Sequence, residues 1–410
     1  MLSDVDVDNL IQPFVDRQHD IEQYVINLIA QHIKEIGEVL PSDVHRLERL
    51  YKSGSNVREI NEQIAKMTGL QLKELKQLIK VVAADCYIDA KPYYDYRHIP
   101  YIPFAQNKGL QTLINALDRQ TNSSFRNLAN SRAIGFVIRD LKHPAKKKFY
   151  NIDEAYKSVI DEAVQATSQR VTDYHTAMRR TLKQLNESGL KRLEWESGYT
   201  QRADTAVKRN ILDGVRGINQ KIHEWLAKKI QANGYEITAH HAPAPDHAPW
   251  QGHILKEKDY DKLQSNKPFK DVKGNKFPAQ KRILGQYNCK HFAYPIIIGV
   301  SKPKYSDEEL QKILEDNEKG ITLPNGRHLT LYEATQYQNQ LALKVRKAKD
   351  GQIMAKNAGD IQLAKEYQID VNKYTKDYKT FNKIAKEQEP TWTDRDDKLT
   401  VSGYKKISTI

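Results

Sequence analysis

Apolar residues recur at three- and four-residue steps over most of this chain, which is the spacing of an amphipathic helix. In the first part of the chain this pattern predicts a long helix stopped by Gly37 and Pro41, then a short helix, then two helices separated at Gly69. The pair from Asn56 to Leu78 has the outline of a helix-turn-helix motif. Its second helix is too apolar to lie in a DNA groove, so the pattern favours packing within the protein.

Residues 91–106 (KPYYDYRHIPYIPFAQ) interrupt the helical pattern. Three prolines, Pro92, Pro100 and Pro103, favour extended backbone. Tyrosines alternate with them, so the segment is either a docking surface for another chain or a strap whose rings pack on its own domain. The sequence leaves both interpretations open. Helical spacing returns over residues 108–141, and a basic, Pro-containing linker at 139–149 predicts a domain boundary.

The central part of the chain is again helical. Residues 151–186 predict one long helix that begins with a capping box and ends at Ser188-Gly189. Residues 193–202 predict a tight turn between short extended pieces, and residues 203–231 predict a further helix. Its basic side is either a phosphate-binding face or a solvated face. The capping residues are Asn151 and Glu154, and the basic residues are Arg202, Lys208, Arg209 and Arg216.

The pattern changes over residues 234–303, where short stiff segments replace the helices. Tyr235–Thr238 and Tyr294–Val300 are apolar runs of the strand type, and a polar, basic loop at 256–282 lies between them. Trp250 is expected to fill the core of this part, beside Gly252, where the backbone must come close to its neighbours. We predict a small α+β domain here.

After Pro303 the helical spacing resumes. Ser306 is expected to cap a short helix, an Asn-Gly turn follows within residues 322–328, and two long helices at 330–349 and 361–386 form an antiparallel pair. Residues 387–410 predict an extended tail. The predicted fold is mostly α with a small α+β domain, in which long helices flank a compact strand-loop module that contains His and Cys. The predicted parts are 1–145, 146–233, 234–303 and 304–410.

The composition limits which binding partners and which cellular compartment we expect. The 410-residue chain has a net charge of +13, which favours an acidic partner such as packaged DNA or an acidic protein surface, although a solvated Lys-rich surface gives the same charge. Its two Cys do not make a disulfide framework. The acidic N-terminus does not resemble a signal peptide, and no apolar run approaches the ~20 residues of a membrane span. We therefore expect folding in a reducing cytoplasm.

One His/Cys constellation in the module has the chemistry of a metal site. Neutral imidazole and thiolate are ligands that zinc accepts in tetrahedral geometry. A metal held by two ligands from one loop and two from a distant segment would join the ends of a long insertion. Closing such a long loop otherwise costs conformational entropy. Alternatively, the His side chains cap turns and the Cys is a small buried apolar residue. The candidate ligands are His240, His247, Cys289 and His291, with His241 and His253 as substitutes.

The sequence offers little for catalysis. Asp246 beside His247, or Cys289 near His291, could form a nucleophile–base pair, and a His-rich fold over a basic loop could be a metal nuclease. No carboxylate cluster, phosphate-binding Gly-rich loop, GxSxG or HExxH motif accompanies them. We therefore predict no catalytic residues, no organic cofactor site and a protein that is not an enzyme.

Several motifs together resemble the phage minor capsid protein 2 family, which is itself similar to the Mu F-like minor head proteins. They are H-x6-H followed by W-Q-G, then N-C-K-H, Y-P and G-V-S-K-P, all within residues 240–303. FRNLANSRA at 125–133, the segment 196–222 and LYEATQYQNQLALKVRKAK at 331–349 extend the likeness in the expected order. One departure is at 242–245, where the family's Gly-Ala-Arg-Pro is Ala-Pro-Ala-Pro.

The resemblance implies a structural minor head protein of a tailed phage, assembled in the host cytoplasm and located in the virion, in the capsid interior or at the portal vertex. The implied partners are the portal protein, head proteins and packaged double-stranded DNA, with no membrane in the particle. Many Mu F-like proteins carry Cys at positions similar to His247 and Cys289, which makes zinc the candidate cofactor. The alternative function is a phage-borne, metal-dependent nuclease or a toxin-like effector delivered with the genome.

Overall fold

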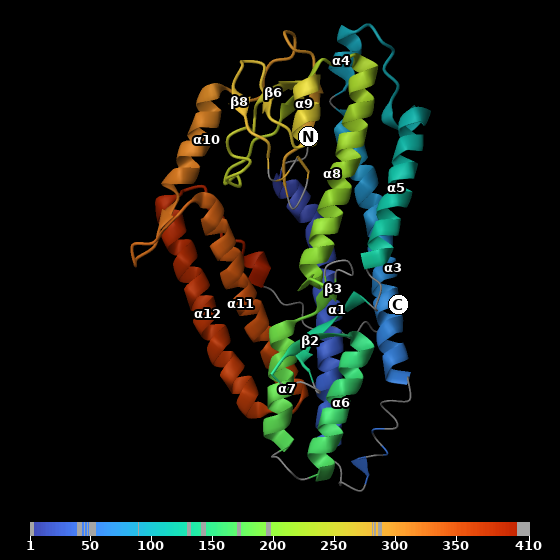
Figure 1. Cartoon of the computed structure of the whole chain (residues 1–410), viewed down its shortest axis with the longest axis vertical. Helices are drawn as coiled ribbons and strands as arrows, with labels where there is room; N and C mark the ends of the chain where they lie inside the picture. Colours follow the sequence, from blue (N-terminus) through green and yellow to red (C-terminus); the bar gives the residue numbers. More distant parts are fainter. Residues whose placement is uncertain are drawn as a thin grey trace.

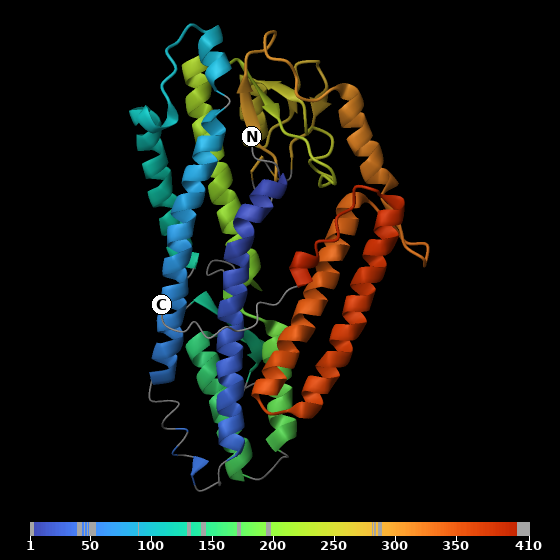
Figure 2. The same cartoon turned by 180° about the vertical axis from the view of Figure 1, so that it is seen from behind.

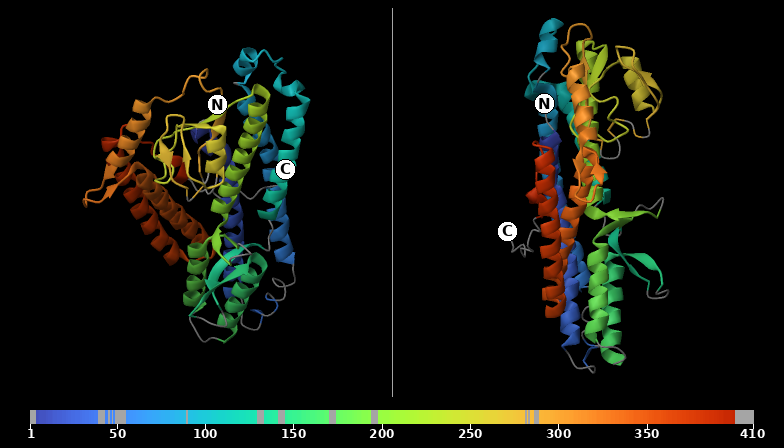
Figure 3. Two further views of the ribbon diagram at one scale, coloured as in Figure 1. Left: turned by 45° about the horizontal axis from the view of Figure 1, so that its top comes forward. Right: turned by 90° about the vertical axis from the view of Figure 1, so that its left-hand side faces the viewer.

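The computed structural model has an elongated helical body with a small mixed module near one end and a helical hairpin along one side (Figure 1). The hairpin and the body are joined by the module and by contacts near the opposite end, as the views in Figures 2 and 3 also show. The structure describes residues 4–38, 43, 44, 46, 48, 55–88, 90–128, 133–140, 145–169, 174–193, 198–280, 282, 284, 285 and 289–399.

Four long helices run along the body: α1 (Asp4–Gly37), α3 (Ser55–Ile88), α5 (Lys108–Leu128) and α8 (Ala203–Ile230). Their apolar stripes meet in one core beside the module. As predicted, α1 ends at Gly37. The core includes Ile11, Phe14, Ile79, Tyr87, Leu110, Phe125, Ile211 and Ile218.

The helix α3 corrects the sequence interpretation, because it continues through Gly69 as one helix. A glycine inside a helix costs only about 1 kcal/mol relative to alanine. The two halves of α3 bury apolar residues in two different cores, Ile60 and Ile64 in one and Leu75 and Ile79 in the other. That burial outweighs the local preference of Gly69, so the helix-turn-helix outline does not exist.

The segment 91–106 is also partly helical, although its prolines favour extended backbone. It opens with α4 (Lys91–Tyr96), in which Pro92 occupies the first turn, where a missing backbone N–H is harmless. The Tyr87 ring stacks on Tyr101 with centroids 5.3 Å apart, and the Tyr87 hydroxyl donates to the Ile102 carbonyl at 2.9 Å. The strap interpretation therefore accounts for these rings.

The opposite end of the body combines helices with an antiparallel sheet of order β2-β1-β3-β4. A capping box at Asn151 and Glu154 opens the first of its two helices, as predicted, with bonds of 2.9 and 3.1 Å. Residues 151–186 are not one helix: two shorter helices pack side by side against the sheet. The elements are β1 (Ile134–Arg139), β2 (Lys147–Asn151), α6 (Ile152–Gln169), α7 (Tyr174–Ser188), β3 (Lys191–Leu193) and β4 (Thr200–Arg202).

The strand β1 replaces the end of the helix that the sequence predicts over 108–141. It pairs with β2 from Gly135 opposite Asn151 to Arg139 opposite Lys147. The predicted boundary between residues 145 and 146 therefore falls between two paired strands. The division of the chain into four parts stays a prediction.

The small module is built on a three-stranded antiparallel sheet of order β6-β5-β9. The predicted second strand is shorter than the apolar run, because β9 ends at Ile296 and the Ile297 carbonyl then accepts from the Val300 and Ser301 N–H groups in a turn. Trp250 fills the core, as predicted, and is 0% exposed. The elements are β5 (Gly234–Ile237), β6 (Ile254–Lys256), α9 (Glu257–Gln264), β7 (Phe269–Lys270), β8 (Lys276–Phe277) and β9 (Ala293–Ile296).

The C-terminal part begins with a short helix capped by Ser306, as predicted, and continues into two long helices that pack side by side. Gly351 lies inside the first long helix rather than at the joint. The Tyr367 ring of the second helix comes so close to its backbone that a Cβ at this position would clash. The elements are α10 (Asp307–Lys319), β10 (Ile321–Thr322), β11 (His328–Leu329), α11 (Leu331–Asn357) and α12 (Ile361–Gln388).

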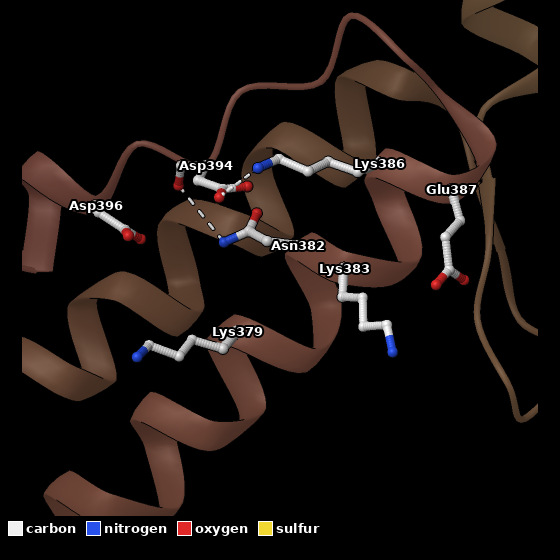
Figure 4. A pocket seen from close by; sticks show the side chains of 7 residues that line it. All are labelled: Lys379, Asn382, Lys383, Lys386, Glu387, Asp394 and Asp396. Atoms are coloured by element: carbon white, nitrogen blue, oxygen red, sulfur yellow. Dashed lines mark hydrogen bonds and ion pairs between the residues drawn. The ribbon is translucent and has the colours of Figure 1, made fainter.

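The segment after α12 folds back on this hairpin, so the prediction of an extended tail is wrong for residues 389–399. Trp392 Nε1 donates to Asn382 Oδ1 at 2.8 Å, and a 3-10 turn, η3, covers Asp396–Leu399. Lys386 Nζ pairs with Asp394 Oδ2 at 2.6 Å (Figure 4). Residues 400–410 of the predicted tail lie outside the described residues.

Charged and polar side chains join the hairpin to the body, beside apolar ones such as Met354, which is buried in the core of the body. Arg179 of α7 makes two hydrogen bonds of 2.8 Å to Asp360, and Lys183 pairs with Glu366 at 3.0 Å. The contact between the hairpin and the body is therefore sensitive to charge, which its most deeply buried pair illustrates. No helix in the described ranges has both the length and the hydrophobicity that a bilayer span requires.

His19 of α1 and Asp350 of α11 form that pair, with His19 Nε2 3.2 Å from Asp350 Oδ1 and both residues at most 5% exposed. Burial lowers the pKa of His19, but the hydrogen bond and charge of Asp350, aided by Glu22 and opposed by Arg346, leave that pKa raised above its usual value. A raised folded-state pKa contributes stability at low pH that is lost as pH rises through it.

We therefore expect His19→Gln to destabilise the protein more at pH 5.5 than at pH 8.5, measured as unfolding free energy against pH. The matched control is His98→Asn on the exposed segment after α4, where asparagine tolerates the positive φ of 52°. A destabilisation by His19→Gln that is equal at both pH values would contradict the protonated pair.

Candidate metal centre

The first candidate ligands lie in the loop that follows β5. The Pro-rich stretch 242–245 leads into tight turns in which the His247 N–H donates to the Ala244 carbonyl at 2.8 Å. Trp250 anchors the turns, because its indole Nε1 donates to the Asp246 carbonyl at 2.8 Å while its ring is fully buried. His247 is thereby held against the core, and its ring centroid is 4.7 Å from that of Trp250.

The other candidate ligands precede β9 on extended backbone. Cys289 and His291 are two residues apart, so their side chains project from the same side of the chain. Cys289 Sγ is 3.5 Å from His291 Nδ1. Tetrahedral zinc with bonds of about 2.3 Å to sulfur and about 2.0 Å to nitrogen places the two ligand atoms roughly 3.5 Å apart. The ligand atoms of His247, Cys289 and His291 all lie within 4.8 Å of one another.

Neighbouring groups fix which nitrogen each imidazole offers. Gln251 Oε1 accepts from His291 Nε2 and from the His240 backbone N–H, both at 3.1 Å. An amide oxygen only accepts, so His291 carries its proton on Nε2 and presents the Nδ1 lone pair to Cys289. In metal sites the second nitrogen of a ligating His is held in the same way.

His247 has the complementary arrangement. One ring nitrogen bonds to the backbone of Arg282, and the other, Nε2, is buried with no hydrogen-bond partner among the described residues. Asp246 Oδ2 lies 3.7 Å from this nitrogen, beyond hydrogen-bond distance. A buried nitrogen without a partner costs free energy, and a metal ion would satisfy it.

The protonation states suit metal binding. Burial lowers the pKa of His247 to about 4 and holds the pKa of His291 well below its usual value, so both imidazoles are neutral at pH 7. Burial raises the pKa of the Cys289 thiol, so a thiolate at this position requires a cation. The donor set of two neutral imidazoles and one thiol fits zinc.

The structure thus brings together three of the four predicted ligands, and His240 lies beside them. Its half-buried ring has its centroid 4.2 Å from that of His291, and its Nδ1 lies 3.2 Å from the His241 carbonyl. His240 would become the fourth ligand only after a rotation of its side chain. His253 is not a substitute, because its Nδ1 is paired with Asp271 Oδ2 at 2.7 Å in another part of the module.

Sequence reasoning missed the groups that orient the ligands. Gln251 was visible only as the middle residue of a W-Q-G motif, and nothing in its spacing indicated a bond to His291. Arg282 reaches Asp246 with two side-chain bonds, one of them 2.7 Å from Nε to Oδ2, which locks the turn that carries His247. This pairing occupies the carboxylate that could otherwise act as a general base.

Comparison with known proteins gives one informative result. No curated protein and no solved structure matches this chain. The profile of one family matches residues 2–382, which is nearly the whole chain and includes the entire candidate metal centre. The chain therefore belongs to the phage minor capsid protein 2 family.

Proposed function

We propose that this phage minor capsid protein is a structural component of the virion that docks on the portal vertex of a tailed-phage head. The observation that carries the proposal is the family match over residues 2–382. The architecture supports it, since long helices joined through buried cores form an elongated scaffold. The family match supports a structural role.

The portal-docking surface in this proposal is the end of the body formed by α3 and the segment 91–106. Although most rings there pack inward, apolar side chains remain on the outside: Ile88 is 66% exposed, Tyr96 50% and Ile102 46%. Exposed apolar side chains gathered at one end of a protein are typical of protein–protein contacts.

Lysine-specific cross-linking of purified virions is expected to join this protein to the portal subunit, because lysines such as Lys80 and Lys91 flank that surface. Cross-linked peptides identified by mass spectrometry provide the measurement. Cross-links from the exposed Lys376 and Lys379 of α12 serve as the internal comparison. Recovery of the protein only in tails, or its absence from particles, would overturn the proposal.

We further propose that the protein contacts packaged or exiting DNA through phosphates, without sequence reading. The net charge of +13 supports this contact. Two of the four basic residues predicted for the basic side of α8 do not provide it: Arg216 is 4% exposed, and Arg202, just before α8, is paired with Glu22 at 3.0 Å and Asp204 at 3.1 Å. Exposed lysines elsewhere, as along α12, remain as the phosphate-contacting groups.

Zinc is the metal that we assign to the His247–Cys289–His291 centre, with His240 as the nearest fourth ligand. Its role in this proposal is structural, because it would tie the loop after β5 to the segment before β9, across some forty residues of intervening chain. The carboxylate beside the three ligands in the described part of the chain, that of Asp246, is held by Arg282. This arrangement supports the structural role over the nuclease alternative.

A further inference from the structure

One turn that the sequence predicts takes no part in the proposed function. It is the Asn-Gly turn between β10 and β11, residues 323–327, which projects from the side of the molecule near the start of α11 (Figures 1 and 2). We call it the β10–β11 turn, and all of it except Leu323 is exposed. The sequence contains a second Asn-Gly pair, Asn233-Gly234, at the start of β5. The chain therefore presents the same dipeptide in two different environments.

An asparagine that precedes a glycine is chemically labile and loses its side-chain amide without an enzyme. The main-chain nitrogen of the glycine gives up its proton and attacks Cγ of the asparagine, and the side-chain nitrogen takes up a proton and leaves as ammonia. The product is a cyclic imide. Water then breaks one of the two ring bonds to the nitrogen, which leaves either aspartate or isoaspartate. Glycine favours the attack because it has no side chain to shield its nitrogen and its backbone rotates freely.

The β10–β11 turn holds Asn325 close to this reacting arrangement. Asn325 Oδ1 accepts from the Arg327 main-chain N–H at 3.1 Å, which folds the side chain back over the peptide bond to Gly326. A donor on this oxygen also stabilises the negative charge that develops there during the attack. Gly326 has a φ of 81° and open space where a Cβ would stand, so no neighbouring group crowds it from that side.

One contact in the turn opposes the reaction. The Gly326 N–H donates to the Leu323 carbonyl at 2.9 Å, as in a three-residue hairpin loop with a bulged glycine, and this bond must open before the nitrogen loses its proton. The turn is an exposed tip, and solvent-exposed backbone hydrogen bonds open at low free-energy cost. The bond therefore slows the reaction relative to an unfolded chain but does not prevent it.

The second pair, Asn233-Gly234, is closed to the same reaction. Asn233 Oδ1 accepts from the Ile298 N–H at 2.7 Å, which holds its side chain toward a distant segment. Gly234 is buried at the start of β5, the central strand of its sheet, and a Cβ there would lie 2.5 Å from the Ile298 side chain. Ring closure at Asn233 would have to break the pairing of this strand.

We propose that Asn325 is a site of spontaneous deamidation, which converts to aspartate and isoaspartate in the folded protein with water as the co-reactant. The conversion adds a carboxylate two residues before Arg327 and, in the isoaspartate product, an extra carbon to the main chain of the turn. The change stays local, because Ile321 and Leu329 at the base of the turn are buried in the core of the C-terminal hairpin. This inference is independent of the proposed function.

The test incubates the full-length protein at 37 °C and pH 8.5, folded and, in parallel, in denaturant. Trypsin then releases the peptides 320–327 and 230–256, which carry the two Asn-Gly pairs. Mass spectrometry measures the conversion of each amide to the acid. Methylation by an isoaspartate-specific methyltransferase measures isoaspartate in the intact protein. The matched control variant is Asn325→Gln, which keeps an amide at the exposed position but must close a larger ring, and therefore reacts more slowly.

In the folded protein, peptide 320–327 is expected to convert at least tenfold faster than peptide 230–256. In denaturant the two rates are expected to agree within a few-fold, because the same dipeptide is then exposed in both. Asn325→Gln is expected to remove most of the isoaspartate. Equal rates for the two peptides in the folded protein would overturn the site, as would an unchanged peptide 320–327 when the denatured sample converts. Isoaspartate that persists undiminished in Asn325→Gln would place the reaction elsewhere and contradict the proposal.

Discussion

Protein purified from zinc-supplemented cells is expected to contain one zinc ion per chain, and Cys289→Ser is expected to abolish it. Cys289 Sγ lies 3.5 Å from His291 Nδ1, and three ligand atoms converge within 4.8 Å. Structural zinc sites contribute about 10–16 kcal/mol of apparent binding free energy in small domains, so chelation is expected to unfold the module locally. Elemental analysis measures the metal, and thermal unfolding with and without chelator measures its effect.

The chain supplies a matched control in its other cysteine. Cys86 is also buried, at 6% exposed, but its Sγ accepts from Asn219 Nδ2 at 3.1 Å, and it belongs to no metal-ligand group among the described residues. Cys86→Ser is therefore expected to keep the zinc. Equal zinc content in both serine variants, or none in the wild type after supplementation, would remove the metal centre.

Trp250→Ala is expected to destabilise the small module by about 3–5 kcal/mol, because it leaves a cavity of indole size in the core. The ring is 0% exposed, packs with its centroid 4.7 Å from that of His247 and 5.3 Å from that of His291, and bonds to the Asp246 carbonyl. The substitution therefore weakens both the core and the turn that carries a metal ligand.

Hydrogen exchange with mass spectrometry separates this local effect from global unfolding. Amides of 234–303 are expected to lose protection in Trp250→Ala, while the hairpin of α11 and α12 keeps its protection, because it has a core of its own that includes Leu341, Tyr378 and Phe381. The comparison variant is Trp392→Ala, on the hairpin. If it lowered protection in 234–303 as much as Trp250→Ala does, Trp250 would not be the anchor of the module.

Local signals in the sequence predicted local structure well. The capping box at Asn151, the cap at Ser306, the stop at Gly37 and the buried position of Trp250 all depend on residues within one or two turns of chain. The sequence also singled out His247, Cys289 and His291, whose ligand atoms the fold brings within 4.8 Å of one another, and metal binding by them stays a prediction. The sequence also placed the chain in its family through motifs spread along its length.

The tertiary structure decided the features that depend on distant partners. Gly69 stays helical because the two halves of α3 are buried in separate cores. Arg202 and Arg216 lose their solvated face because the fold pairs the first with Glu22 of α1 and buries the second. Gln251 became visible only when the fold placed it beside His291. Periodicity and capping report on neighbours along the chain, whereas burial, ion pairing and ligand orientation are set by segments that the fold brings together.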